Sequence, residues 1–140
     1  MLIGEFHHNL DNKNRLMMPS KTLEYLSSEV IVARGFEKCL LVYPVKKWES
    51  MIEKFSELSI TKSDTRKFMR MFLSGATSCK FDSQKRICIP SVLKDYAGIE
   101  KSVTILGLDD HLEIWDEEAY NEFLEENLSS FASIAENIYE

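Results

Sequence analysis

The sequence is poor in the residues that build disulfide frameworks, metal centres and phosphate-binding loops. Its 140 residues include three cysteines, five glycines and three histidines. Cys39, Cys79 and Cys88 show no Cys-x-x-Cys spacing, which argues against a structural zinc site and is typical of reduced thiols in a cytoplasmic protein. Five glycines are too few for a glycine-rich phosphate loop, and the chain has neither His-Glu-x-x-His nor Gly-x-Ser-x-Gly. We therefore expect no cofactor, no bound metal and no small-molecule substrate.

Long apolar runs are also lacking. No segment approaches the roughly 20 apolar residues that span a bilayer. The first residues, MLIGEFHHNLDNKNR, do not place an apolar stretch after a basic start, so we expect no secretory signal. These features predict a protein without a membrane partner.

Basic residues are absent from the last part of the chain. The formal net charge of −6 argues, at face value, against binding to the phosphates of a nucleic acid. However, residues 1–101 hold all 17 Lys and Arg and 12 of the acidic residues, whereas residues 102–140 hold the other 11 acidic residues. The net charge is therefore the sum of +5 and −11 in two segments. At a Debye length of about 8 Å, separated faces of opposite charge act almost independently.

The chain contains an internal repeat. With an offset of 71 residues, DNKNRLMMPS (11–20) aligns with DSQKRICIPS (82–91). The identical residues are Asp11, Arg15, Pro19 and Ser20 with Asp82, Arg86, Pro90 and Ser91. A one-residue insertion then changes the offset to 72, which aligns Gly35 with Gly107. Because each copy of about 45 residues is near the lower limit for independent folding, we expect the two to pack into one composite domain about a pseudo-two-fold axis.

Each copy shows the same order of expected elements. Strands are predicted at residues 2–8 and 77–81, at 15–18 and 86–89 closing hairpins, at 29–34 and 102–107, and at 39–43 and 111–115. Short helices are expected at 20–26 and 91–97, with Ser20 and Ser91 as N-caps. Apolar residues at helical spacing predict an amphipathic helix at the end of each copy, the second one capped by Asp116.

A basic helix is expected between the copies, in residues 61–74. Ser63 or Thr61 could cap its start, and Phe68, Met71 and Phe72 form its apolar face. Its charged residues are mostly basic and include Arg66, Lys67 and Arg70, which we treat as candidate secondary DNA contacts. A basic helix face that is merely solvated is the competing interpretation.

The two D-x-x-x-R strings, each followed by three apolar residues and Pro-Ser, resemble those of the MraZ family. The opening GEFHHNLD, the segments ARGFEKCLLVYP and RKFMRMFLSGAT, and the ending LEIW are similar as well. The similarity extends over residues 1–125, with Asn14 at a position where glycine is common. It implies an α+β fold of two AbrB-like swapped-hairpin repeats forming one composite barrel with flanking amphipathic helices. The domains implied are repeats at 5–47 and 76–119, a helical connector at 48–75 and an acidic helix and tail at 120–140.

The resemblance also implies a function. Members of this family would bind short tandem promoter repeats upstream of their own gene, in the division and cell-wall gene cluster, as ring-shaped, octamer-like homo-oligomers. We therefore expect a cytoplasmic, nucleoid-associated regulator whose partners are double-stranded DNA and further copies of itself.

The residues themselves point to the hairpin tips as the DNA surface. Lys13, Arg15, Lys85 and Arg86 are the predicted DNA contacts, because lysine attracts phosphate and the planar arginine fork can pair with phosphate or a guanine edge. We expect a structural role for Asp11 and Asp82. Their carboxylates would accept hydrogen bonds from backbone N–H groups of the turn and would orient the arginines. A purely structural Asp–Arg pair remains the alternative for both arginines.

Two other functions stay open. One is a metal-dependent hydrolase using His7, His8 and Asp11, although adjacent residues of a strand point to opposite faces. The other is a non-enzymatic protein-interaction or assembly module in the cell-division system, which the amphipathic, acidic C-terminal segment would suit. That segment could also screen the basic face until DNA competes.

Overall fold

A computed structural model describes residues 1–139 and has the α+β architecture that the sequence predicts. The strands are β1 (Leu2–Asn9), β2 (Arg15–Met17), β3 (Glu29–Arg34), β4 (Leu40–Pro44), β5 (Thr77–Lys80), β6 (Arg86–Cys88), β7 (Ser102–Asp109) and β8 (Leu112–Asp116). The helices are η1 (Ser20–Thr22), α1 (Leu23–Leu26), α2 (Val45–Phe55), α3 (Ser63–Ser74), α4 (Ser91–Tyr96), α5 (Glu117–Asn127), η2 (Leu128–Ser130) and α6 (Phe131–Ile138).

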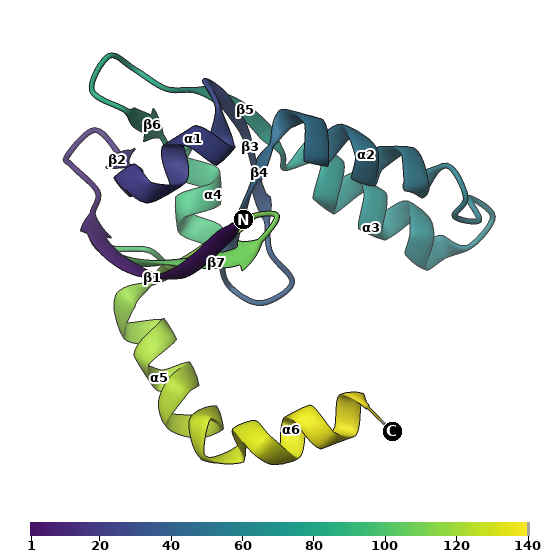
Figure 1. Cartoon of the computed structure of the whole chain (residues 1–140). Coiled ribbons are helices and arrows are strands. Elements are labelled where there is room, and N and C mark those ends of the chain that lie inside the picture. The colour runs from purple at the N-terminus through teal and green to yellow at the C-terminus, as the bar shows by residue number, and fades with distance from the viewer. Residues whose placement is uncertain (140) are drawn as a thin grey trace.

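The two repeats are interleaved in one antiparallel sheet. Its strand order is β1-β7-β8-β4-β3-β5, so that the first strand of each repeat pairs with a strand of the other repeat. A separate two-stranded ribbon is formed by β2 and β6, and Figure 1 shows it beside α1 and α4 on one side of the sheet. Neither repeat therefore has a complete sheet of its own. The two repeats form one composite domain, as the sequence predicts.

Strand register reveals the pseudo-two-fold axis. In the ribbon, Leu16 pairs with Ile87, its own equivalent at an offset of 71. At the centre of the sheet, Leu41 pairs with Glu113, its equivalent at an offset of 72. Residues that pair with their own repeat equivalents lie on a two-fold axis, so the axis passes through both sites.

Two details of the expected pairing are wrong. The strands at 15–18 and 86–89 do not close hairpins with β1 and β5; they pair with each other, because Leu16 and Ile87 bury their side chains in the shared core. The expected offset of 72 is also wrong for β3 and β7. Val30 pairs with Cys79, and Val103 pairs with His8, the repeat equivalent of Cys79. Val30 and Val103 are therefore equivalent, which gives an offset of 73 between β3 and β7.

The loops after β3 and β7 follow this corrected offset. Gly35 donates its backbone N–H to Cys39, and Leu108 makes the equivalent bond to His111, so Gly35 corresponds to Leu108 and not to Gly107.

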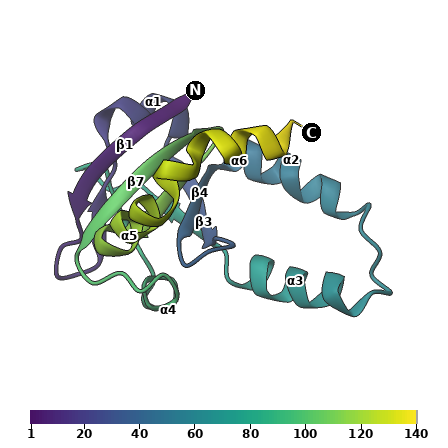
Figure 2. The same ribbon diagram turned by 90° about the horizontal axis from the view of Figure 1, so that it is seen from below.

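The principal core fills the space between the sheet, the ribbon and the short helices. Leu16, Ile87, Leu26, Leu93 and Ile105 are among its fully buried side chains. A second, aromatic cluster attaches α2 and α3 to the other face of the sheet and is built around Ala33, Leu41, Tyr43 and Phe72, with Trp48, Phe55 and Phe68 packed against it. Figure 2 shows α2 and α3 running out side by side from the sheet.

Helix starts follow the sequence only in part. Asp116 caps α5 as predicted, accepting a hydrogen bond from the backbone N–H of Ala119 at 3.3 Å. Ser20 and Ser91 are not caps: Pro19 and Pro90 occupy the N-cap positions, since the fixed φ of proline ends the preceding extended segment there. Likewise Lys62, and neither Thr61 nor Ser63, is the N-cap of α3.

The C-terminal helices leave the body of the protein. α5 packs on β7 and β8, and the chain then turns through η2 into α6, so that α5, η2 and α6 form a bent arm, which we call the C-terminal hook (Figure 1). No helix among residues 1–139 is long and apolar enough to cross a membrane.

Candidate nucleic-acid interface

The turn before β2 is organised by one carboxylate. Asp11 Oδ1 accepts the backbone N–H groups of Lys13 and Arg15, each at 2.9 Å, and Oδ2 accepts Arg15 Nε at 2.7 Å. The backbone N–H of Asn14 bonds the carbonyl of Asp11 at 3.0 Å, and Asn14 has φ of 60°. Asparagine tolerates this left-handed conformation better than most residues, which accounts for its place in a position typical of glycine.

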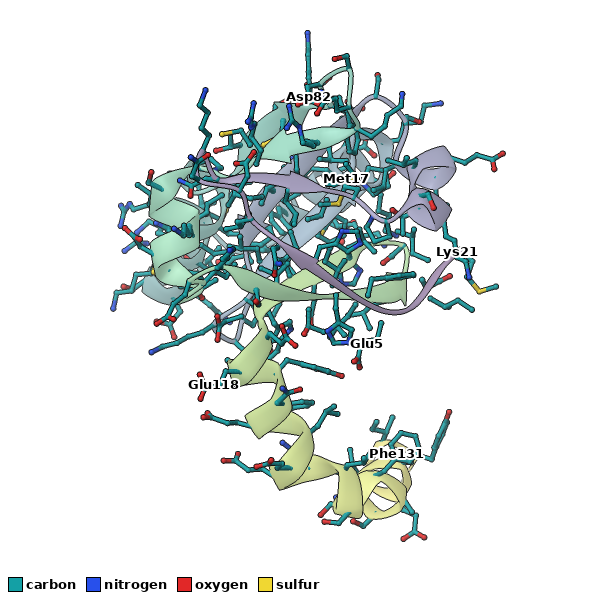
Figure 3. All side chains as sticks on the ribbon, turned by 90° about the vertical axis from the view of Figure 1, so that its left-hand side faces the viewer. Glu5, Met17, Lys21, Asp82, Glu118 and Phe131 are labelled. Atoms are coloured by element: carbon teal, nitrogen blue, oxygen red, sulfur yellow. The ribbon has the colours of Figure 1, made fainter. Side chains whose placement is uncertain are left out.

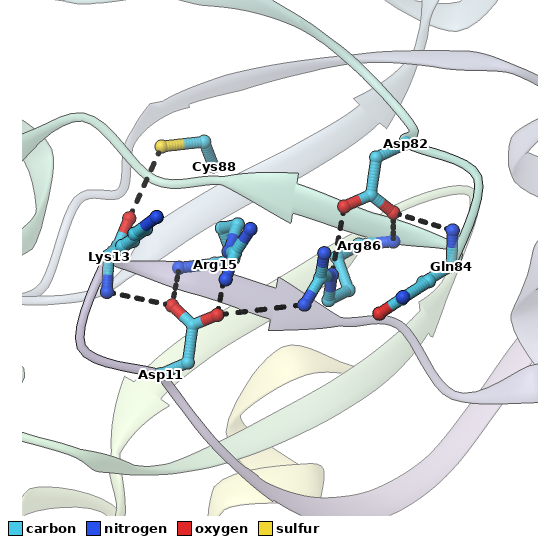
Figure 4. Close-up of polar contacts among 7 residues, drawn as sticks. All are labelled: Asp11, Lys13, Arg15, Asp82, Gln84, Arg86 and Cys88. Carbon is cyan, nitrogen blue, oxygen red and sulfur yellow. Dashed lines mark hydrogen bonds and ion pairs between the residues drawn. The ribbon is translucent and has the colours of Figure 1, made fainter.

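The turn before β6 repeats this arrangement. Asp82 Oδ1 accepts the backbone N–H groups of Gln84 and Arg86 at 2.9 Å, and Oδ2 accepts Arg86 Nε at 2.8 Å. Lys85 has φ of 62°, as Asn14 has in the first turn. Figure 4 shows the two turns at opposite ends of the ribbon. The structural role predicted for both aspartates thus agrees with the geometry.

The hydrogen bonds hold both carboxylates in the charged form. The backbone N–H of Arg15, against an opposing effect of burial, lowers the pKa of Asp11 from 3.8 to about 2. The equivalent N–H of Arg86 lowers the pKa of Asp82. Both turns therefore keep an ionised aspartate across the neutral range.

The ribbon has one buried face and one open face. Leu16 and Ile87 point into the core and are fully buried, which fixes the alternation of side chains along both strands. Arg15 and Arg86 consequently lie on the opposite face, at diagonal positions across the strand pair, together with Met17 and Cys88. The ribbon is thus a rigid platform that presents two arginines outward.

Charge on this face is balanced at its centre and positive at its ends. Each arginine bonds its own aspartate, and Arg86 Nη1 lies 3.8 Å from Asp11 Oδ2, so the four groups form one neutral cluster (Figure 4). The arginine side chains remain 33% and 22% exposed, and each gives Nε to its own aspartate, so the outer nitrogens make no hydrogen bond within residues 1–139 although Nη1 of Arg86 faces Asp11.

The lysines supply the excess charge. Lys13 and Lys85 are exposed, and within residues 1–139 neither has an ion-pair partner. The two turns are not chemically identical: by the offset of 71, Lys13 corresponds to Gln84, whereas Lys85 corresponds to Asn14. The ribbon therefore carries two free lysines, one at each end, at positions that differ by one residue.

The candidate secondary contacts lie elsewhere. Figure 1 shows α3 across the molecule from β2 and β6, so the structure does not bring Arg66, Lys67 and Arg70 together with the ribbon cations. Arg66 also has a local role, because its Nη1 donates to the carbonyls of Ile60 and Thr61 at 2.9 and 3.0 Å and closes the turn before α3.

Sequence reasoning missed three polar or apolar side chains of the ribbon surface. Gln84 is exposed at the second turn, Met17 is 48% exposed opposite Arg86, and Cys88 is exposed with its thiol 3.6 Å from the Lys13 carbonyl. Gln84 could have been found from the repeat offset, which aligns it with Lys13. Met17 and Cys88 could have been found from strand alternation with Leu16 and Ile87 buried.

His7 on β1 belongs to the hydrolase alternative. His7 lies near carboxylates, with Nε2 at 2.9 Å from Glu5 Oε2 and Nδ1 at 3.9 Å from Glu117 Oε1. Within residues 1–139, no three His, Cys, Asp or Glu side chains are grouped so that they could hold a metal ion.

Comparison with known proteins agrees with the duplicated architecture. The family model described as "MraZ protein, putative antitoxin-like" matches residues 1–71 and again residues 72–139. A protein of Natranaerobius thermophilus named "Transcriptional regulator MraZ" is 44% identical over 138 residues, which cover 99% of this chain and 96% of that protein. The family model that matches twice along the chain and the near-complete alignment with the relative confirm the resemblance seen in the paired D-x-x-x-R strings. The chain belongs to the MraZ family.

Proposed function

We propose that this protein is a transcriptional regulator that binds double-stranded DNA sequence-specifically through the β2–β6 ribbon. The observation that carries the proposal is the pair of equivalent turns that present Lys13, Arg15, Lys85 and Arg86 on the open face of one rigid ribbon. The relative named as a transcriptional regulator supports the same role. The targets are short tandem repeats in the promoter of the division and cell-wall gene cluster, as the family resemblance implies.

The shape and chemistry of the ribbon suit a groove of DNA. The major groove of B-DNA admits a two-stranded ribbon, and an arginine fork can pair with O6 and N7 of guanine. Asp11 and Asp82 act as positioning residues, because each holds one arginine by a hydrogen bond to Nε, while the outer nitrogens, which make no hydrogen bond within residues 1–139, bind the ligand. Met17, which pairs with Arg86 and follows Arg15 on the same face of β2, is placed to contact a thymine methyl group.

A single chain offers few cations, so the proposal includes self-association. Two free lysines per ribbon give only weak phosphate attraction, whereas a ring of several copies presents one ribbon per subunit to successive repeats. Linked binding sites gain affinity through effective concentration when their spacing matches. The proposal places the protein at the nucleoid in the cytoplasm and requires no cofactor and no catalytic step.

The test is binding to DNA from upstream of the protein's own gene, measured by fluorescence anisotropy at fixed salt. Arg15→Ala should weaken specific binding by about 5- to 150-fold, the worth of one bidentate base contact. Arg15→Lys, which keeps the charge and loses the fork, should lose specificity while retaining binding to unrelated DNA. Lys54→Ala on α2, which lies outside the ribbon and the surfaces proposed for self-association, serves as the control and should bind as the wild type does. Unchanged specific affinity in both Arg15 variants, with an intact fold, would refute the assignment.

A further inference from the structure

The C-terminal hook has an apolar inner face. An elongated groove of about 580 Å³ runs along α5, η2 and α6, and its lining includes Phe123, Leu128, Phe131, Ile134 and Ile138. Phe131 and Ile138 are 72% and 73% exposed. Figure 3 shows Phe131 far from the body of the protein, to which the hook is joined near Glu118. Contiguous exposed apolar surface of this kind marks an interaction site.

The helices that form the groove carry charge of one sign. α5 and α6 contain no basic residue, and their glutamates, none of which lines the groove itself, are Glu117, Glu118, Glu122, Glu125, Glu126 and Glu136. A partner of matching chemistry therefore combines an apolar surface with basic residues nearby.

A surface of that kind exists on the opposite arm of the same chain. We call it the aromatic knob; it consists of Phe36, Phe68, Met71 and Phe72, around a shallow hollow of about 210 Å³. Phe36 is 77% exposed although its ring lies 6.1 Å from those of Phe68 and Phe72, and Met71 is 59% exposed.

The knob is held rigidly. Tyr96 donates its hydroxyl to the carbonyl of Gly35 at 2.6 Å, and Arg34 lies over the Tyr96 ring. Gly35 leaves no room for a side chain, because a Cβ atom there would meet the sulfur and carbonyl of Cys39. Phe36 is thus presented to solvent by a fixed loop, and an aromatic residue presented in this way costs little conformational entropy to dock.

Basic residues border the knob. Arg34 lines the hollow, and Lys67 and Arg70 lie on α3 beside Met71. Figure 1 shows α6 apart from α2 and α3, so the hook and the knob of one chain do not cover each other. The two surfaces are complementary in polarity and in charge and are both left open by the single chain.

We propose that the C-terminal hook of one copy receives the aromatic knob of the next copy. This interface joins two different surfaces, and repetition of such a head-to-tail contact closes into a ring when its rotation permits. The inference rests on the self-association included in the proposed function and names its contact surfaces. In this interface, Lys67 and Arg70 form ion pairs with glutamates of the neighbouring copy and do not contact DNA.

The experiment measures the mass of the full chain in the absence of DNA by sedimentation velocity. The wild type should be a multimer, and Phe131→Asp on the hook or Met71→Asp on the knob should each reduce it to single chains. An equimolar mixture of these two variants should form a complex of two chains, since one variant keeps a working knob and the other a working hook. Asn137→Asp adds the same charge to α6 outside the groove and should keep the wild-type mass.

Each other outcome contradicts the inference. A single-chain wild type, or a multimer that survives Phe131→Asp and Ile138→Asp, would exclude the hook as the interface. If Met71→Asp remained a multimer, or if the mixture stayed as single chains, the contact would not join hook to knob. Circular dichroism of each variant establishes folding. Because mass is measured without DNA, failure of the proposed DNA binding leaves this result unaffected and is detected separately.

Discussion

Removal of both free lysines of the ribbon should change the salt dependence of DNA binding by a defined amount. The aspartates and arginines at the centre of the open face form a neutral cluster, so Lys13 and Lys85 are the charges that release counterions from DNA. Each phosphate neutralised contributes about 0.9 to the slope of log K against log salt. Lys13→Ala combined with Lys85→Ala should therefore reduce the slope by about 1.8 for each ribbon bound.

This difference is large enough to measure directly. Between about 50 and about 200 mM salt, a change of about 1.8 in slope corresponds to a roughly 12-fold smaller loss of affinity for each ribbon bound. Anisotropy titrations at four or five salt concentrations give the slope, and Lys46→Ala combined with Lys54→Ala provides a control with two exposed cations removed on α2. The reasoning would be refuted by a slope that stays the same in the ribbon variant, or by one that falls only in the control.

The remaining predictions concern stability and thiol chemistry. Leu16→Ala, at the pseudo-two-fold axis, should lower the free energy of unfolding by about 2–5 kcal/mol in urea titrations, because the side chain is fully buried; a loss below about 1 kcal/mol would contradict the packing. The pKa of Asp11 is lowered from 3.8 to about 2, so its ionised form stabilises the fold fully above pH 3.8, and this stabilisation is lost as the pH falls through about 2. The urea midpoints of wild type and Asp11→Asn should therefore differ most at neutral pH and converge near pH 2, and a constant difference would refute the role of the carboxylate. Burial raises the pKa of Cys79 to about 11, so a maleimide at pH 7 should label the exposed Cys88 first and thereby weaken DNA binding; faster labelling of Cys79 would contradict the model of the ribbon.

The internal repeat made most of the fold predictable, because each expected strand could be checked against its copy. The pairing of the strands is harder to predict from the sequence. The segments at 15–18 and 86–89 read as local hairpin strands, but burial of Leu16 against Ile87 favours pairing between repeats. Propensity acts within a few residues, whereas this pairing joins residues 71 positions apart, so local patterns do not determine it.

The candidate site likewise has one part that the sequence predicts and another that depends on contacts between the repeats. Asp11 and Asp82 could be assigned to turn amides from their residue type and spacing, and the geometry agrees. The neutral cluster of the four charged groups could not be foreseen, because it depends on Arg86 approaching Asp11 across the ribbon. The sequence of the C-terminal segment predicts its acidic charge and an amphipathic helix, whereas the groove that Phe131 and Ile138 help to line depends on the turn at η2 between α5 and α6.

Photo-crosslinking from the ribbon to DNA tests the proposed interface most directly. A photoreactive maleimide would be attached at Gln84→Cys in a Cys88→Ser background, since Gln84 is exposed at one end of the ribbon and its side chain makes no hydrogen bond within residues 1–139. The matched probe is Lys54→Cys on α2 in the same background, at an exposed position outside both proposed surfaces. Irradiation with DNA from upstream of the protein's own gene should crosslink the repeats from position 84 and not from position 54. Crosslinks from position 54 alone, in a protein that binds this DNA with full affinity, would contradict the assignment of the ribbon as the DNA surface.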